Sequence, residues 1–95
     1  MVYLKNKEEV LKRIAEWESL YNEVKDRNTM AYLNLLNSMR NDYEIVEDYN
    51  KCAKICKEIE DFCVATDLQD TNISNILLAS YDSRARCGDF RAYCI

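Results

Sequence analysis

Five cysteines are the most reactive side chains in this sequence. Cys52, Cys56 and Cys63 recur at helical spacing on one face, and Cys87 and Cys94 follow later in the chain. Four converging thiolates can hold zinc, but structural zinc sites favour closely spaced cysteine pairs on turns, which this sequence lacks. Cysteine is also among the most frequently buried residue types. We therefore expect reduced cysteines packed in a core, with a metal site and a redox or interchain disulfide as alternatives.

A second candidate site lies in the C-terminal part of the sequence, where arginines and tyrosines occur together. Arg84, Arg86 and Arg91 carry guanidinium groups, which bind phosphates and carboxylates. A tyrosine such as Tyr81 or Tyr93 can stack on a base. This group predicts a pocket for a nucleotide phosphate or another small anion. The alternative is that the arginines pair with the acidic middle of the chain. The candidate acidic partners are Glu58, Glu60 and Asp61.

The sequence contains no histidine and one glycine. The usual general base near neutral pH is therefore missing, and no Ser–His or Cys–His pair can form. A single glycine excludes a P-loop and a dinucleotide-binding fingerprint. Catalysis by carboxylates or lysine remains open in principle, but no pair of carboxylates stands out. We expect no enzymatic activity, no metal and no cofactor.

Acidic residues dominate the middle of the chain. The net charge is −4, and residues 28–70 carry four basic and nine acidic groups. Binding to nucleic acid or to anionic membranes needs a basic surface. The sequence also has no apolar run of about 18 residues and no signal-peptide core. These features predict a cytoplasmic protein that binds neither nucleic acid nor a membrane.

A first helix is predicted at about residues 7–26, because apolar residues recur there at alternating spacings of four and three. The members of this stripe are Val10, Ile14, Trp17, Tyr21 and Val24. Asn6 and Glu9 form a capping-box-like pair at its start. Asn28 and Thr29 then make a short connection, with Thr29 able to cap the next helix. Such a short connection predicts that the two helices lie antiparallel.

The segment 30–65 contains two apolar stripes that are one position out of register. The first stripe consists of Tyr32, Leu36, Met39, Tyr43 and Val46. The second consists of Ile45, Tyr49, Cys52, Cys56, Ile59 and Cys63. One long helix is the favoured interpretation, because Asn and Asp inside a helix cost less than about 1 kcal/mol each. The alternative is a break near residues 41–42, where Asn41 and Glu44 can cap a restart.

A last helix is predicted at residues 72–87. Asp70 or Thr71 is suited to cap its start, and Gly88 is suited to end it. Its apolar face is formed by Ile73, Leu77, Tyr81 and Ala85. The chain thus predicts a single all-α domain over residues 1–95, an antiparallel helical hairpin or bundle of three to four helices with a long central helix.

Self-association follows from the long-helix interpretation. Two shorter helices cannot cover the whole length of a helix that spans residues 30–65, so a second copy is expected to complete the core by homo-oligomerisation. The residues assigned to this interface are Tyr32, Leu36, Met39, Tyr43 and Tyr49. If the helix breaks near residue 41, a compact monomeric four-helix bundle is expected instead.

Three functions fit these features. The first is a non-catalytic interaction or regulatory module that binds a protein partner and itself. The second is a protein that binds a nucleotide or another small anion through the C-terminal arginines and tyrosines. The third is an inhibitor of the kind that phages encode against host defence or transcription proteins.

Overall fold

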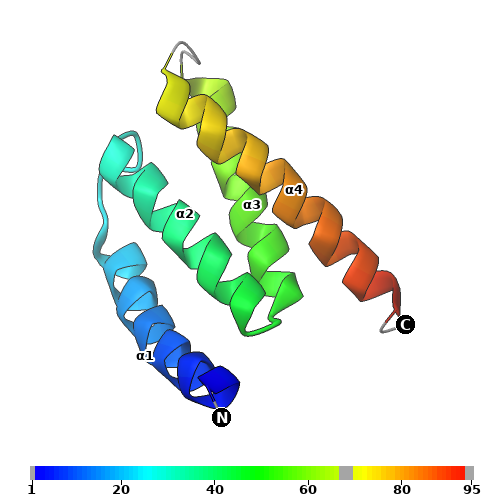
Figure 1. Cartoon of the computed structure of the whole chain (residues 1–95). Coiled ribbons are helices and arrows are strands. Elements are labelled where there is room, and N and C mark those ends of the chain that lie inside the picture. Colours follow the sequence, from blue (N-terminus) through cyan, green and yellow to red (C-terminus); the bar gives the residue numbers. More distant parts are fainter. Residues whose placement is uncertain (1, 67–69, 94–95) are drawn as a thin grey trace.

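The chain folds into four α-helices that are joined by short connections (Figure 1). A computed structural model describes the backbone of residues 2–66 and 70–93 and the side chains of residues 7–66 and 70–88. The helices are α1 (Val2–Glu23), α2 (Met30–Ile45), α3 (Tyr49–Ala65) and α4 (Thr71–Tyr93). No strand occurs in the described backbone, which confirms the prediction of an all-α fold.

The segment 30–65 forms two helices, so the prediction of one long central helix is wrong. The break lies at residues 46–48 and not at residues 41–42, where the alternative interpretation placed it. Asp42 instead lies inside α2 and is buried. The register shift between the two apolar stripes therefore marks a change from one helix to the next. The change lies a few residues after Asn41 and Asp42, the polar residues that suggested a break.

The end of α2 is a Schellman-type cap, formed around a residue in the left-handed conformation. Glu47 has φ 63°. Its amide donates to the carbonyl of Glu44 at 3.1 Å, and the amide of Asp48 donates to the carbonyl of Tyr43 at 2.9 Å. The side chain of Asp48 then accepts from the amide of Lys51 at 3.3 Å and caps α3. Glycine usually occupies the left-handed position, so a glutamate there gave no warning of the break.

The outer helices also differ from their predicted bounds. α1 begins and ends earlier than predicted, and Asn6, the predicted N-cap, lies within it. α4 begins after Asp70, whose side chain accepts from the amide of Asn72 at 2.7 Å. It continues to Tyr93, so the prediction that Gly88 ends it is wrong. The φ of Gly88 is not positive, and a Cβ added at this position would meet nothing within 4 Å.

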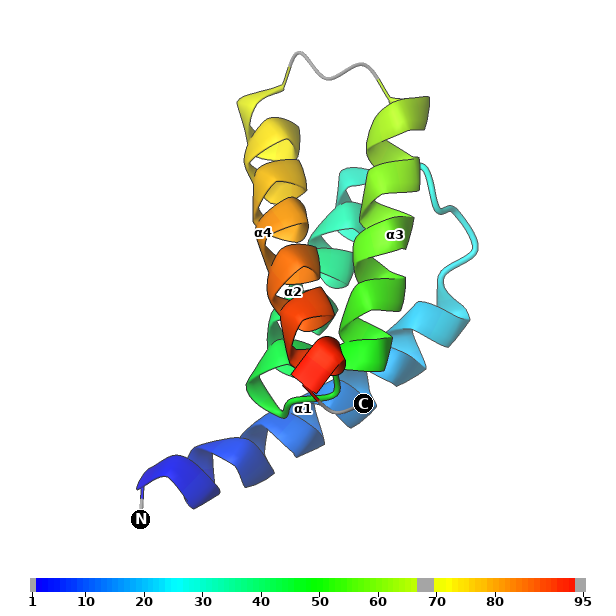
Figure 2. The ribbon, with the colours of Figure 1, turned by 90° about the vertical axis from the view of Figure 1, so that its right-hand side faces the viewer.

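α3 is the central helix of the bundle. It packs against α2 on one side and α4 on the other, whereas the backbone of α1 approaches α2 alone. Figure 2 shows the N-terminal half of α1 projecting away from α3 and α4. The most deeply buried apolar side chains are Leu33, Leu36, Ile59, Cys52, Cys56, Cys63 and Cys87. The core is therefore formed by α2, α3 and α4, and α1 adds to it from one side.

A buried carboxylate attaches α1 to α2. Asp42 accepts from the guanidinium of Arg13 through Nε at 2.8 Å and Nη2 at 2.7 Å. It also accepts from the indole Nε1 of Trp17 at 2.7 Å. Because hydrogen bonds to charged groups are stronger than neutral ones, this arrangement fixes the register of the two helices. Below it, Val10 and Ile14 bury their side chains in the core.

The residues that the sequence assigned to an interface between chains lie in the core of a single chain. Tyr32, Leu36, Met39 and Tyr43 are buried, and Tyr49 is half-buried against the same core. The first stripe turns inward because α2 ends early enough for α3 to fold back over it. These side chains are directed mainly into the core, so most of them have little exposed surface for contact with a second copy.

The molecule is elongated for its length. Its principal extents are 42 × 29 × 22 Å, and its radius of gyration is 13.7 Å. A compact domain of this length has a radius of gyration of about 12 Å. Within the described residues, none of the helices is both long enough and apolar enough to serve as a membrane span.

Candidate interaction groove and polar cleft

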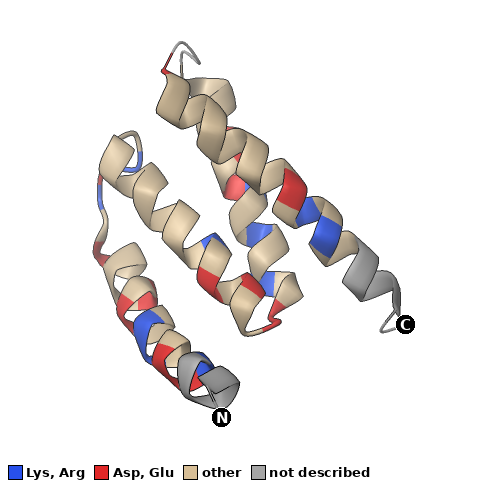
Figure 3. Cartoon of the chain, viewed as in Figure 1, with Lys and Arg blue, Asp and Glu red and all other residues tan. Residues whose placement is uncertain are grey.

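Two segments of the chain lack charged residues entirely. Residues 30–39 of α2 and residues 71–81 of α4 contain no Lys, Arg, Asp or Glu, although 32% of the whole chain is charged. α2 and α4 run in the same direction, so both segments lie at the same end of the bundle (Figure 3). Depletion of charge is typical of the centre of a protein interface. This end of the molecule is therefore the candidate location of an interaction surface.

An apolar groove of about 400 Å³ lies between α1 and α2 at this end, and we call it the α1–α2 groove. It is lined by Trp17, Leu20, Val24, Thr29, Ala31, Tyr32, Asn34, Leu35 and Ser38. Leu20 is 46% exposed. Trp17 uses its indole N–H for Asp42 and so offers the groove an apolar ring. None of the lining residues is Lys, Arg, Asp or Glu.

The groove continues onto a neutral outer face of α2. Asn34, Asn41 and Ile45 are exposed there, and Ser38 lies between them. The charged residues of α2 point elsewhere, toward α1 or α4. Solvated helix faces are normally rich in charged residues. The α1–α2 groove and this face together form a continuous surface without ionised groups.

A second depression, which we call the α1–α3 cleft, lies between α1 and α3. Met39 and Tyr43 of α2 also line it. It has a volume of about 280 Å³, and both charged and apolar side chains line it. It is lined by Glu18, Tyr21, Asn22, Met39, Tyr43, Lys51, Lys54, Ile55 and Glu58. The cleft exists because the backbone of α1 packs on α2 and leaves a gap to α3 that long side chains bridge.

Tyrosine–glutamate hydrogen bonds cross the α1–α3 cleft. Tyr21 donates its hydroxyl hydrogen to Oε1 of Glu58 at 2.7 Å, and Tyr43 donates to Oε1 of Glu18 at 2.8 Å. Lys51 lies 3.7 Å from the same oxygen of Glu18. Burial, with the carboxylate that each hydroxyl contacts, raises the pKa of both Tyr21 and Tyr43. Both tyrosines therefore stay protonated and act as donors at neutral pH.

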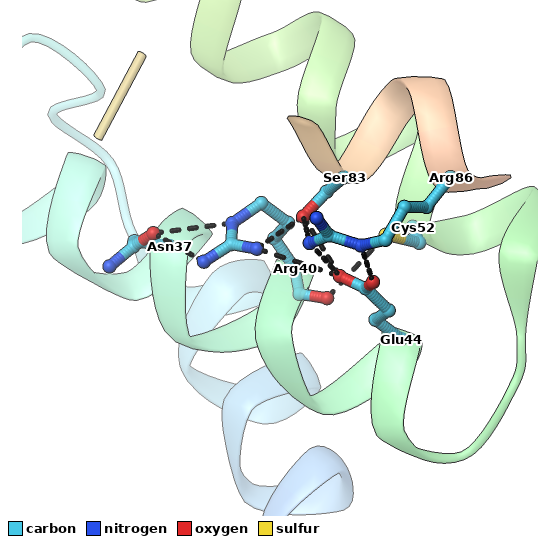
Figure 4. A network of polar contacts seen from close by, with 6 residues as sticks. All are labelled: Asn37, Arg40, Glu44, Cys52, Ser83 and Arg86. Atoms are coloured by element: carbon cyan, nitrogen blue, oxygen red, sulfur yellow. Dashed lines mark hydrogen bonds and ion pairs between the residues drawn. The ribbon is translucent and has the colours of Figure 1, made fainter. Parts of the chain in front are cut away.

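Arg40 is the centre of a polar network between α2 and α4, which we call the α2–α4 network (Figure 4). Its guanidinium donates twice to Oδ1 of Asn37, at 3.3 and 3.0 Å, and once to the hydroxyl of Ser83. Ser83 donates to Oε1 of Glu44 at 2.9 Å, and Arg86 donates to both carboxylate oxygens of Glu44. The bond from Arg86 lowers the pKa of Glu44. The network is fully hydrogen-bonded, and it fixes α4 on α2.

The structure does not bring the predicted anion-binding residues together. Arg84 pairs with Glu60 of α3, at 2.6 and 2.8 Å, whereas Arg86 pairs with Glu44 of α2. The two guanidiniums therefore leave α4 on opposite sides. Tyr81 is half-exposed. The side chains of Arg91 and Tyr93 lie outside the described residues. Pairing with acidic residues, as with Glu60, is the role that the structure supports for Arg84 and Arg86.

The cysteines of α3 and α4 lie in the core. Cys52, Cys56, Cys63 and Cys87 are buried free thiols. A hydrogen bond between Cys52 and Cys56 raises the pKa of Cys52 and lowers that of Cys56, while burial raises the pKa of Cys63 and Cys87. No metal-binding group of three or more His, Cys, Asp or Glu forms within the described part of the chain. The structure supports core packing for these four, and Cys94 lies outside the described residues.

Comparisons with known proteins find no family model, no curated protein and no solved structure that matches this chain.

Sequence patterns did not reveal the two depressions. Sequence reasoning assigned no role to Leu35 or Glu18, and it suggested Glu58 only as a partner for the C-terminal arginines. The uncharged segments 30–39 and 71–81 are the one signal in the sequence that pointed to the interaction surface. Nothing comparable marked the α1–α3 cleft, because its residues come from three helices.

Proposed function

We propose that this protein is a non-catalytic interaction module that self-associates through the α1–α2 groove. The observation that carries the proposal is an open apolar groove of about 400 Å³ without ionised lining residues, next to an uncharged face of α2. Burial of apolar surface is the main driving force of association, and an interface core is depleted of charge. The groove combines both properties.

The surface area of the chain supports a partner of considerable size. The accessible surface is 6606 Å². A compact monomer of this mass exposes about 5700 Å². The excess of about 900 Å² is close to the area of about 800 Å² that each partner buries in a standard interface. The backbone of α1 approaches α2 alone, which leaves flanks of both helices uncovered and is consistent with this excess.

A second copy of this chain is the occupant that fits the groove. A surface without ionised groups offers no charge complementarity to an acidic or a basic partner. Two copies of this surface can meet without charge repulsion. In a two-fold arrangement, Leu20 of each copy would enter the groove of the other between Trp17 and Leu35. The two α1–α2 pairs would then form a four-helix interface, in which the uncovered flanks of α1 and α2 become buried.

Variants of two leucines on α1 test this interface. Leu20→Asp places a carboxylate in the α1–α2 groove, and burying it without a partner costs several kcal/mol. Leu11→Asp is the matched control, because Leu11 is 51% exposed on the same helix and does not line the groove. Sedimentation equilibrium over a micromolar to millimolar range should show a monomer–dimer equilibrium for the wild type and for Leu11→Asp. Leu20→Asp should remain monomeric.

Two outcomes would overturn the proposal. One is a wild-type chain that stays monomeric over the whole concentration range. The other is a Leu11→Asp variant that dissociates as fully as Leu20→Asp, since the effect would then follow from added charge and not from the groove. Circular dichroism of each variant verifies that the helices remain folded.

A further inference from the structure

The α1–α3 cleft contains a buried acceptor without a donor. Oε1 of Glu58 accepts from Tyr21, but Oε2 of Glu58 is buried and has no hydrogen-bond partner. It is the one such side-chain atom among the described residues. A buried polar atom that stays unpaired destabilises a protein by about 1–3 kcal/mol, and by more if it is charged. Folded proteins pair nearly all such groups with protein, ligand or ordered water, and because Glu58 lines the cleft, a donor that enters the cleft can supply the missing hydrogen bond.

The two tyrosines of the cleft also offer a ligand no hydrogen-bond donor. Tyr21 and Tyr43 give their hydroxyl hydrogens to Glu58 and Glu18. Each hydroxyl oxygen therefore keeps its capacity to accept, and the carboxylate oxygens of Glu18 and Glu58 are acceptors as well. A ligand that lies against these groups must bring several N–H or O–H donors. With two carboxylates present, an ammonium group is the best match.

Lysines next to the two carboxylates supply a second requirement for a ligand. Lys51 lies 3.7 Å from Glu18 and 3.9 Å from Asp48, so its charge is already shared. Lys54 lines the cleft one helical turn before Glu58, and within the described part of the chain it has no ion pair. Residues four apart on a helix are neighbours at about 6 Å. Lys54 is thus placed to meet a carboxylate on the same ligand whose ammonium group meets Glu58.

We infer that the α1–α3 cleft binds a small aliphatic zwitterion, with its ammonium group on Glu58 and its carboxylate on Lys54. The two glutamates and two lysines of the lining balance each other, which fits a ligand without net charge. Met39 and Ile55 offer an apolar contact for a short aliphatic body. A volume of about 280 Å³ suits a compact ligand. The inference does not depend on the α1–α2 groove, which lies on different residues.

Titration with 4-aminobutyrate, followed by the amide signals of ¹⁵N-labelled full-length chain, tests this site. The expected result is a saturable shift of signals from residues that line the α1–α3 cleft. Butylammonium and butyrate each carry one of the two charged groups, and each should bind at least several-fold more weakly. Glu58→Gln should weaken 4-aminobutyrate binding about tenfold or more, because a carboxylate contact to ammonium is lost.

Control variants separate binding from folding. Glu60→Gln changes the same residue type on α3, but Glu60 pairs with Arg84 away from the cleft, so this variant should bind like the wild type. Lys54→Met alters an exposed residue and should weaken 4-aminobutyrate while leaving butylammonium unchanged. The inference is overturned if 4-aminobutyrate produces no saturable shift, or if Glu58→Gln binds it as tightly as Glu60→Gln does. Leu20→Asp should still bind, which distinguishes failure of this site from failure of the α1–α2 groove.

Discussion

Arg40, Asp42 and Glu44 are spaced two residues apart on α2, and each points to another helix. Arg40 and Glu44 meet Ser83 and other groups of α4, whereas Asp42 meets α1. Hydrogen bonds that involve a charged group are stronger than neutral ones. These three side chains therefore fix the orientation of α2 against both neighbours. They also explain how α2 carries charges and still presents a neutral outer face.

Glu44 makes the stability of the fold depend on pH. The hydrogen bond from Arg86, with further help from Ser83, lowers the pKa of Glu44 in the folded chain. A carboxylate whose pKa is lower in the folded chain stabilises the fold at pH values above its pKa in the unfolded chain, about 4.3. This contribution is lost as the pH falls through the pKa of the folded chain. Urea unfolding of the wild type should therefore show a falling midpoint below about pH 5. Glu44→Gln should be less stable at pH 7 and show a weaker decrease.

Glu47→Gln is the control for this titration. Glu47 is exposed, and no ion pair involves it within the described residues. Its variant should follow the wild-type curve of unfolding midpoint against pH. Parallel curves for Glu44→Gln and the wild type would contradict the role that we assign to the carboxylate of Glu44.

At the scale of the helices, Gly88 is the residue that the structure places most differently from the sequence expectation. It lies inside α4, its φ is not positive, and its missing Cβ leaves open space. Glycine inside a helix is less favourable than alanine by about 1 kcal/mol. Gly88→Ala should therefore raise the free energy of unfolding by about 0.5–1 kcal/mol, measured by urea denaturation.

A reciprocal change on the same helix controls for position. Ala85 is exposed one turn earlier, so Ala85→Gly should lower stability by a similar amount. If Gly88 were a left-handed helix end, as its sequence context suggests, Gly88→Ala would instead be destabilising. A lower unfolding midpoint for Gly88→Ala would thus contradict the extended α4.

Sequence periodicity predicted the inward face of α1 correctly, but the apolar face predicted for the last helix is wrong in part, because Tyr81 and Ala85 are exposed and Ser80, Ser83 and Cys87 are buried instead. Periodicity also failed where one backbone conformation decided the outcome. The stripe through Val10, Ile14 and Trp17 does face the core or its edge in α1. The end of α2 depends on the left-handed Glu47, a residue type that seldom takes this conformation. Propensity differences of less than 1 kcal/mol per residue cannot locate such a break. Packing of α3 back onto α2 supplies the larger free energy that selects it.

At the scale of the whole molecule, α1 is the least integrated helix. Its backbone approaches α2 and neither α3 nor α4, whereas α3 lies between two neighbours. Regions with few tertiary contacts open locally with a smaller free energy than the core. Native-state hydrogen exchange should therefore show amides of α1 exchanging faster than those of α3. A set of α1 amides that exchange only by global unfolding would contradict this arrangement.

The two candidate sites depend on this same arrangement and so could not be read from local patterns. Tyr21 and Glu58 are 37 positions apart in the chain and meet because α1 lies across α2 at a distance from α3. The interhelical angle is a property of the packed molecule, and each depression is a consequence of that angle. The absence of charge in residues 30–39 and 71–81 was visible in the sequence, but its location at one end of the bundle was not.

The connection at residues 46–48 keeps α2 and α3 as two separate helices. This separation allows the chain to fold back on itself. If these residues became helical, α2 and α3 would join into one rod, and α3 could no longer fold back on its own α2. The apolar stripes would then be buried only if two chains exchanged their C-terminal halves. The contacts between α2 and α3 would in that case form between chains instead of within one chain. The left-handed conformation of Glu47 therefore allows α2 and α3 to pack against each other within one chain, without exchange of helices between two chains.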